Sequence, residues 1–454
     1  MRRLVAGACI AVAAAGSLVV AYVVLTFDPA RRLLPVAAIV TAVSAAAVLA
    51  ALLALRRPLA SQLTVLLAIG SALVGLYAVE TTLAVSPALR LGLGEAFRAV
   101  DSRSKLQVIR DLRDDGRAVW SSFAPSLVVS SPADLAGAAG FLPLGSIPDS
   151  TAVSCNEAGR WLVYETDEHG FNNPRGIWGT GPVDILALGD SFTHGACVPP
   201  RDNMLGWLRR THPRTLNLGA MGNGPLLQLA GLVEYGSLVQ PRTVLWFFFE
   251  GNDLMDLRNE LRNPLLGRYL EPGFSQGLPD QRPRIRAVLE PYLDEAFRVA
   301  EAANPSAGQK AIDAVMLRHL RHALRLDRVV SPTAAVPRDQ AVMDSLGDLR
   351  RVLERARTVA GGWEGRVVFI YLPAWTTVVD ERDRPNPQHE AVMAAVSSLG
   401  FPVVDAYAAF RSHPDPGRLF RYPGSHYNEA GYRLVAETIQ KAGVLPAASV
   451  PAAR

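Results

Sequence analysis

The chain has 454 residues, enough for two or three domains, and 49% of them are hydrophobic, a high share for a purely soluble protein. The net charge of +4 is small and no basic block with interleaved aromatic residues occurs, which argues against nucleic acid as a partner. The hydrophobic excess is local, because it is concentrated near the N-terminus.

Three uncharged stretches at the N-terminus predict membrane spans. They are Leu4–Phe27, Leu33–Leu55 and Pro58–Val79, and each exceeds the roughly 20 residues that cross a bilayer core. The first is too long for a signal-peptide core and two more follow it, so we expect a retained anchor. Residues 1–90 therefore predict a multi-pass anchor in the inner or plasma membrane.

The charges around these stretches do not settle the orientation. The pairs Arg2–Arg3 and Arg56–Arg57 favour a cytoplasmic N-terminus, whereas Arg31–Arg32 and the arginines after the third stretch favour the opposite. With three spans and a cytoplasmic start, everything after about residue 90 would lie outside the cytoplasm.

Residues 91–180 predict a juxtamembrane helix followed by an irregular linker or cap. Apolar residues between 96 and 115 recur at helical spacing, and the pattern ends at Gly116. From 121 to 153 the chain is rich in small residues, proline and glycine and shows no periodicity.

Residues 181–446 have the pattern of a doubly wound α/β domain. Apolar runs without alternation predict strands buried on both faces, at 183–189, 215–219, 242–250, 366–372 and 401–405. Helical patterns accompany them at about 203–211, 225–239, 340–359, 388–399 and 428–442. This alternation predicts a parallel sheet that binds its ligand outside the carboxyl ends of the strands.

The segment at about 255–338 interrupts this rhythm. It contains helical patterns near 283–302 and 309–326. Because a structureless loop of this length is uncommon in a compact domain, we expect a helical insertion on the active-site side, serving as a lid or a dimer contact.

Candidate chemistry follows the first three predicted strands and precedes the last helix. Ser191 lies beside a predicted helix N-terminus, whose unpaired N–H groups favour an oxyanion. Gly222 allows a close backbone approach, and Asn252 offers a side-chain amide. His426 precedes a helix that Asn428 can cap. A nucleophile, two oxyanion donors and a base are the groups that acyl transfer requires.

These residues lie in four blocks that resemble the SGNH/GDSL hydrolase superfamily. The blocks are "GDSFTHG", "NLGAMGNG", "EGND" and "SHYNEAGY", in the family's order over about residues 183–442. The resemblance implies a flavodoxin-like three-layer α/β/α sandwich with a five-stranded parallel sheet, and hydrolysis or transfer of ester-linked acyl groups. We expect no cofactor. It also implies an oxyanion hole formed by the N–H groups of Ser191 and Gly222 and the amide of Asn252. The segment "VYETDEHGFNNP" (163–174) looks like one that precedes the serine block in membrane-attached bacterial members.

One departure from the family pattern concerns the acid of the triad. Three residues before His426, where the family usually has aspartate, this chain has Pro423. Three alternatives follow: a Ser–His dyad oriented by a backbone carbonyl, another acid such as Asp405 or Asp415, or an inactive relative. A second departure is Glu250 before Gly-Asn-Asp, which we expect to point away from the pocket or to pair with an arginine.

Further residues could support the site. His194 and Trp375 are candidate substrate contacts, and ordinary packing is the alternative for both. Cys155 and Cys197 are the only cysteines outside the anchor; they could form a disulfide in an oxidising compartment, or be two independent buried thiols. No metal site is predicted.

The leading hypothesis is a membrane-anchored serine esterase that removes acyl groups from an envelope glycan or lipid through an acyl-enzyme on Ser191. Transfer of the acyl group to an exopolysaccharide or envelope glycan is the first alternative, because the first half-reaction is the same. An inactive glycan-binding or assembly protein is the second. The partners expected are thus the acylated substrate and the membrane.

Overall fold

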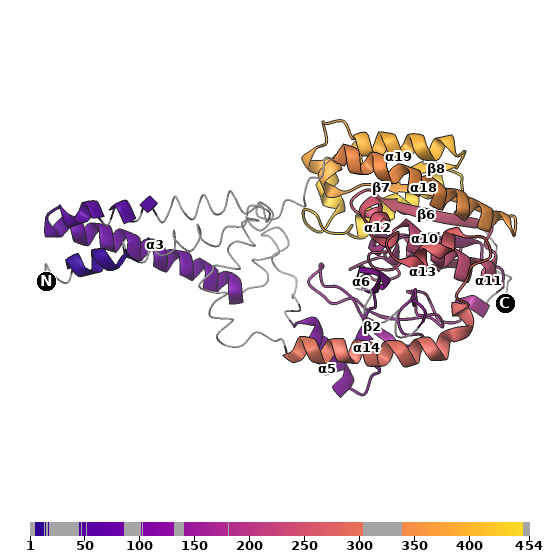
Figure 1. Ribbon diagram of the computed structural model, residues 1–454, viewed down its shortest axis with the longest axis horizontal. Helices are drawn as coiled ribbons and strands as arrows, with labels where there is room; N and C mark the ends of the chain where they lie inside the picture. Colours follow the sequence, from indigo (N-terminus) through magenta and orange to yellow (C-terminus); the bar gives the residue numbers. More distant parts are fainter. Residues whose placement is uncertain are drawn as a thin grey trace. The chain divides into compact units, whose positions relative to one another are not determined.

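The computed structural model describes residues 52–85, 101–130, 140–302 and 338–447, with single gaps at 102 and 180, together with short stretches between residues 5 and 50. The chain divides into two compact units (Figure 1). The first comprises Met1–Arg98 and Asn304–Val336, and the second comprises Ala99–Ala303 and Pro337–Arg454.

The first unit contains the long apolar helix α3 (Leu59–Val85). Its segment Leu59–Val79 has the length and composition of a membrane span, and apolar side chains such as Val74 are largely exposed. Among the described residues this is the one helix of that kind, so three spans are not supported. The stretches expected at 4–27 and 33–55 lie largely outside the described residues.

The second unit is built on a five-stranded parallel sheet. Its strands are β4 (Ile185–Leu188), β5 (Thr215–Asn217), β6 (Thr243–Phe249), β7 (Arg366–Leu372) and β8 (Val403–Asp405). Their spatial order is β5-β4-β6-β7-β8 and every pairing is parallel. Numbered along the chain this is the order 2-1-3-4-5 of flavodoxin-like folds. The expected fold is therefore confirmed.

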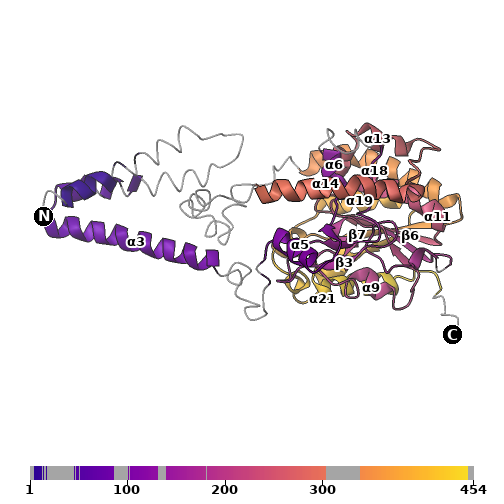
Figure 2. The same ribbon diagram turned by 90° about the horizontal axis from the view of Figure 1, so that it is seen from below.

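Helices cover both faces of this sheet, as Figure 2 shows for α18 and α19 on one side and α9 and α21 on the other. The first layer contains α10 (Pro225–Gly231), α12 (Asp253–Glu260), α18 (Arg338–Gly361) and α19 (Pro387–Ser398). The second contains α9 (Met204–Leu208), α20 (Ala406–Ser412) and α21 (Glu429–Lys441). The central strands are apolar throughout because both of their faces are buried between these layers.

A small cap precedes the sheet. It contains α5 (Lys105–Asp114), β1 (Val119–Ser121), α6 (Pro125–Ser130), β2 (Thr151–Val153) and β3 (Val163–Glu165). Strand β2 pairs in parallel with β1 and antiparallel with β3. The segment expected to be an irregular linker therefore contains a three-stranded sheet.

The insertion contributes α14 (Arg282–Ala302), close to the helix expected at 283–302. This helix packs on the cap, where Asp294 accepts a hydrogen bond from Arg113 at 2.6 Å. The second expected helix, at 309–326, lies outside the described residues. Shorter helical elements are η2 (Ile177–Gly179), α8 (Ser191–His194), η3 (Leu232–Gly236), α11 (Ser237–Val239), α13 (Pro264–Gly267), η4 (Arg268–Leu270), η5 (Leu278–Gln281), η6 (Thr376–Asp380) and η7 (Pro416–Leu419).

Candidate active site

Ser191 lies directly beyond the carboxyl end of β4, at the first position of the short helix α8. The turn before it requires glycine, since a Cβ on Gly189 would lie 2.0 Å from Oγ1 of Thr193. Asp190 then caps the helix by accepting a hydrogen bond from the N–H of Phe192 at 2.9 Å. This tight strand-to-helix turn holds the serine hydroxyl at the sheet edge.

His426 meets Ser191 from the segment that leads into α21. Its Nε2 lies 2.8 Å from Oγ of Ser191. Asn428 fixes the start of α21 by accepting hydrogen bonds from Ala430 and Gly431. The ring of Phe192 packs against the imidazole, with centroids 4.8 Å apart. The two residues expected to act as nucleophile and base are therefore adjacent.

A glutamate from the cap completes a hydrogen-bonded chain. Oε1 of Glu157 lies 2.8 Å from Nδ1 of His426, and Oε2 accepts a hydrogen bond from the backbone N–H of the same histidine at 3.0 Å. Two contacts from one carboxylate fix both the ring and the backbone of His426. A carboxylate on Nδ1 stabilises the tautomer in which Nε2 accepts the serine proton.

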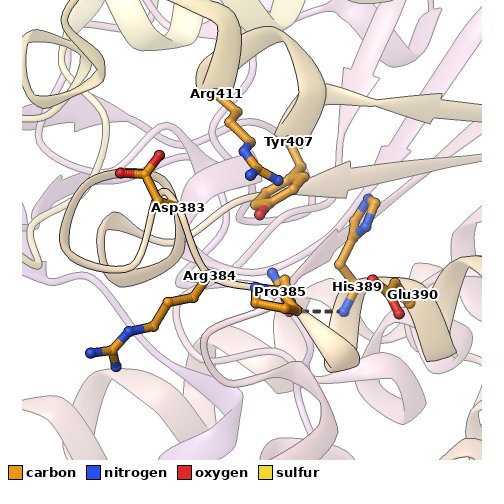
Figure 3. Close-up of a pocket in the computed structure, with 8 residues that line it drawn as sticks. Asp383, Arg384, Pro385, His389, Glu390, Tyr407 and Arg411 are labelled. Carbon is orange, nitrogen blue, oxygen red and sulfur yellow. Dashed lines mark hydrogen bonds between the residues drawn. The ribbon is translucent and has the colours of Figure 1, made fainter.

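The aspartates expected to take this role lie elsewhere. Asp405 caps α20 and contacts Nε2 of His389 at 3.0 Å. His389 lines a separate pocket of about 300 Å³ with Tyr407 and Arg411, and no residue of the Ser191 site lines it (Figure 3). Asp415 is exposed and pairs with Arg418 at 3.3 Å. Both candidates are thus wrong, since each caps a helical turn or pairs locally rather than facing His426.

The turn that precedes His426 explains why position 423 is a proline. The N–H of Ser425 donates to the carbonyl of Tyr422 at 3.0 Å, and Gly424 has a φ of 76°. Proline at the second position and a left-handed glycine at the third are typical of a type II turn. The turn occupies the position of the family's aspartate, and Glu157 approaches Nδ1 from another part of the chain.

Gly222 and Asn252 lie in the loops after β5 and β6. Gly222 has a φ of 72°, and a Cβ there would lie 2.4 Å from Oγ of Ser126, so this position requires glycine. Asn252 precedes α12 without capping it through its side chain. Among the described residues, neither Ser191 nor Gly222 donates its backbone N–H to a protein acceptor. These groups remain available to a ligand oxygen.

The two expected substrate contacts, His194 and Trp375, can be placed in the structure. His194 is buried and lies 2.9 Å from the hydroxyl of Tyr164, so it joins the cap to the core. Burial and, to a smaller extent, His426 lower the pKa of His194 to about 4, which keeps it neutral. Trp375 is half-buried, donates to Asp380 and packs edge-on against Phe420.

Glu250 connects the loops after β6 and β7 through several hydrogen bonds. It accepts hydrogen bonds from the hydroxyl of Tyr371, the N–H of Ala374, the hydroxyl of Thr377 and the amide of Asn386. These partners include no arginine. The carboxylate secures the loop that leads into Asn252.

Asp167 stabilises the segment 163–174 through several hydrogen bonds. It accepts hydrogen bonds from the N–H groups of His169 and Phe171, the amide of Asn173 and the indole of Trp178. The amide of Asn173 also donates to the carbonyl of Asn217, at the end of β5. The segment therefore joins the cap to the sheet beside the glycine block.

Buried carboxyls lie beneath the site. Burial raises the pKa of Asp190 to about 6, opposed by the N–H of Phe192 and by His426. Burial and then the charge of Asp190 raise the pKa of Asp256 to about 7, and burial also raises the pKa of Asp253. Removing carboxyls from water favours their neutral form, which limits the negative charge near Ser191.

A disulfide joins Cys155 to Cys197 beside the triad. A carboxylate oxygen of Glu157, a ring nitrogen of His426 and Sγ of Cys197 all lie within 4.8 Å of one another. This donor set does not suit a metal ion, because a disulfide sulfur is not a thiolate and both ring nitrogens of His426 already have partners.

A comparison with solved structures finds similar proteins at low identity. A putative G-D-S-L lipolytic protein from Desulfitobacterium hafniense is 14% identical, with a TM-score of 0.32 over 57% of this chain and 99% of its own. A lipase/acylhydrolase from Enterococcus faecalis is 16% identical, with a TM-score of 0.31 over 59% and 100%. An acetylxylan esterase from Geobacillus stearothermophilus is 14% identical, with a TM-score of 0.31 over 60% and 98%.

No family model matches the chain, and no curated protein matches it. The fold assignment therefore stands on the strand order, and the assignment of the site stands on its own hydrogen bonds.

Sequence reasoning missed Glu157, which lies 269 residues from His426 and outside all four motif blocks. One signal could have found it. If Cys155 pairs with Cys197, then the acid two positions after Cys155 must lie close to the serine block.

Proposed function

We propose that this protein is a membrane-anchored serine esterase that acts outside the cytoplasm on an acylated envelope glycan or lipid. The observation that carries the proposal is the continuous chain from Ser191 Oγ through His426 to Glu157, with both contacts at 2.8 Å. Hydroxyl, imidazole and carboxylate in this order are the groups of a nucleophilic triad.

In the proposed reaction, Oγ of Ser191 attacks the ester carbonyl while Nε2 of His426 takes its proton. Glu157 stabilises the imidazolium that forms. The N–H groups of Ser191 and Gly222 and the amide of Asn252 would stabilise the oxyanion. His426 then returns the proton to the leaving alcohol, and water resolves the acyl-enzyme by the same steps.

The contacts of Glu157 also bear on the alternative hypothesis that this protein is an inactive relative. That alternative rested on Pro423 occupying the position of the family's aspartate. Because Glu157 contacts both Nδ1 and the backbone N–H of His426, the absence of aspartate at this position is no longer a reason to expect inactivity.

Two features support the location. The helix α3 is apolar over Leu59–Val79 and long enough to cross a bilayer. The Cys155–Cys197 disulfide favours an oxidising compartment, because cytosolic thiols are kept reduced. An anchored catalytic domain on the outer side of the membrane would find its substrate among envelope components.

The test uses the full chain in membranes or detergent with a short-chain aryl ester. We expect hydrolysis that Ser191→Ala abolishes, whereas Ser412→Ala, which changes an exposed serine on α20, retains it. Hydrolysis unchanged in Ser191→Ala would overturn the proposal. An impermeant fluorophosphonate on intact cells should label the wild-type chain, which tests the location of the site.

The same preparation separates hydrolysis from transfer. With an acceptor glycan present, release of free acid alone supports the esterase. Acyl gain on the glycan would instead identify an acyltransferase, which uses the same first half-reaction.

A further inference from the structure

The disulfide joins the segment that carries the triad acid to the segment that carries the nucleophile. Cys155 lies two residues before Glu157, and Cys197 lies in the turn that follows α8. The sulfur of Cys197 is within 4.8 Å of both the Glu157 carboxylate and the His426 ring. The covalent link is therefore in the immediate surroundings of the hydrogen bond that orients the base.

Glu157 lies on a loop between β2 and β3 that is held mainly by the cap itself. At the base of the loop, the N–H of Ser154 donates to the carbonyl of Leu162 at 2.8 Å, and a second bond returns from Leu162 to Cys155. Further along, Asn156 donates to the carbonyl of Asp101 at 2.8 Å. These bonds shape the loop but do not connect it to the sheet.

The connections from this loop to the core are few. Apart from the disulfide and the Glu157–His426 contacts, the connection given among the described residues is an ion pair, 3.6 Å long, between the exposed Arg160 and the partly exposed Glu429. An exposed pair of this kind contributes little to stability. At the other end of the disulfide, Cys197 is buried, so that end is well fixed.

A covalent link beside an attachment of few contacts lowers the entropy cost of the Glu157–His426 contact. Without it, the loop and the long Glu157 side chain must lose conformational freedom each time they meet His426. With it, the carboxylate stays at high effective concentration beside Nδ1. Catalysis is sensitive to this, because a misplacement of about 1 Å in a catalytic site can cost about 10²-fold in rate.

We propose that the Cys155–Cys197 disulfide is the positioning element that holds Glu157 against His426, so that full activity requires the oxidised protein. A phosphine reductant would supply two electrons, and water would supply two protons. The S–S bond would break to give two thiols, and the phosphine would take up the water oxygen to become a phosphine oxide. The newly made, reduced chain would then be a poor esterase until it reaches an oxidising compartment. This inference rests on the proposed function.

The experiment measures kcat and KM of the full chain in detergent for an aryl acetate, before and after reduction with a water-soluble phosphine. We expect kcat to fall about 10²-fold with little change in KM, and to recover on reoxidation. The variant Cys155→Ser/Cys197→Ser should match the reduced protein. Cys9→Ala, which removes the remaining cysteine, should behave like the wild type.

Glu157→Ala provides the decisive comparison. If the disulfide acts through Glu157, reduction should leave the low residual activity of this variant unchanged, because the group to be positioned is absent. A further fall by the same factor as in the wild type would overturn the proposal, since the disulfide would then act through stability of the whole domain.

One further measurement and one assay condition separate the proposed effect from other causes of lost activity. A downfield proton resonance from Nδ1–H of His426 should be present in the oxidised protein and lost on reduction, which a purely global effect on a folded protein would not produce. All assays include a chelator, so that a trace metal bound by the freed thiols and His426 does not cause the loss. If the wild type is active and reduction leaves its activity unchanged, this inference alone is overturned. If the oxidised wild type is inactive and a fluorophosphonate does not label Ser191, the proposed function is overturned.

Discussion

Glu157 contacts His426 through both of its carboxylate oxygens, at 2.8 Å to Nδ1 and 3.0 Å to the backbone N–H, although 269 residues separate the two in the chain. The carboxylate that we propose as the acid of the triad thus comes from the cap that precedes the five-stranded sheet. The usual position for it, three residues before the histidine, belongs to a proline–glycine turn. A base can keep its tautomer and orientation when the carboxylate arrives from another part of the fold.

The first prediction concerns this acid. Glu157→Gln should lower kcat by roughly 10²–10⁴-fold, because the amide can present the wrong group to Nδ1 and cannot stabilise the imidazolium. Steady-state kinetics with an aryl acetate checks it. The matched control is Asp415→Asn, which changes an exposed acid outside the site and should keep wild-type turnover. If the control loses activity and Glu157→Gln does not, the triad is misassigned.

A second prediction concerns the turn before the base. Pro423→Asp restores the residue that the family usually has, yet it should not raise kcat, because Glu157 already occupies Nδ1 of His426. Thermal unfolding should show a modest loss of stability, since proline preorganises this position of the turn. A clear gain in kcat would mean that Glu157 orients the base poorly.

The oxyanion donors allow a third prediction. Asn252→Ala should lower kcat by about 10²–10³-fold with little change in KM, because the amide would act mainly on the charge that develops in the transition state. Asn259→Ala serves as the comparison, since Asn259 is exposed on α12, the helix that Asn252 precedes. Equal kinetics for the two variants would remove Asn252 from the oxyanion hole.

A fourth prediction concerns pH and stability. Burial and the neighbouring Asp190 raise the pKa of Asp256 to about 7 in the folded protein, above its ordinary value of 3.8. Between about pH 4 and 7 the folded state therefore binds more protons than the unfolded state, and this group's contribution to stability falls as the pH rises. Asp256→Asn should raise the melting temperature at pH 8 relative to the wild type and change it little near pH 4.

The control for that measurement is Asp383→Asn, an exposed loop residue that should shift stability equally at both pH values. If Asp256→Asn stabilises the protein no more at pH 8 than at pH 4, the carboxyl is ionised in the folded protein over this range.

The membrane anchor is the part of the sequence-based prediction that the structure supports only in part. Three uncharged stretches met the length criterion for spanning, whereas the described residues contain one such helix, α3. Length and hydropathy identify segments that can enter a bilayer. They do not establish that each one forms a continuous helix.

The sequence by itself predicted the sheet, because uninterrupted apolar runs require burial on both faces. The carboxyl ends of parallel strands share one edge, so the residues that follow these strands, Ser191 among them, were expected there. The meeting of Ser191 with His426, which precedes the last helix, was implied by the resemblance of the motif blocks to SGNH/GDSL hydrolases. Only the tertiary structure decided which acid orients the base. Glu157 lies on a loop of a separate small sheet, and its approach to His426 depends on how that cap packs and on the Cys155–Cys197 link, neither of which follows from periodicity along the chain.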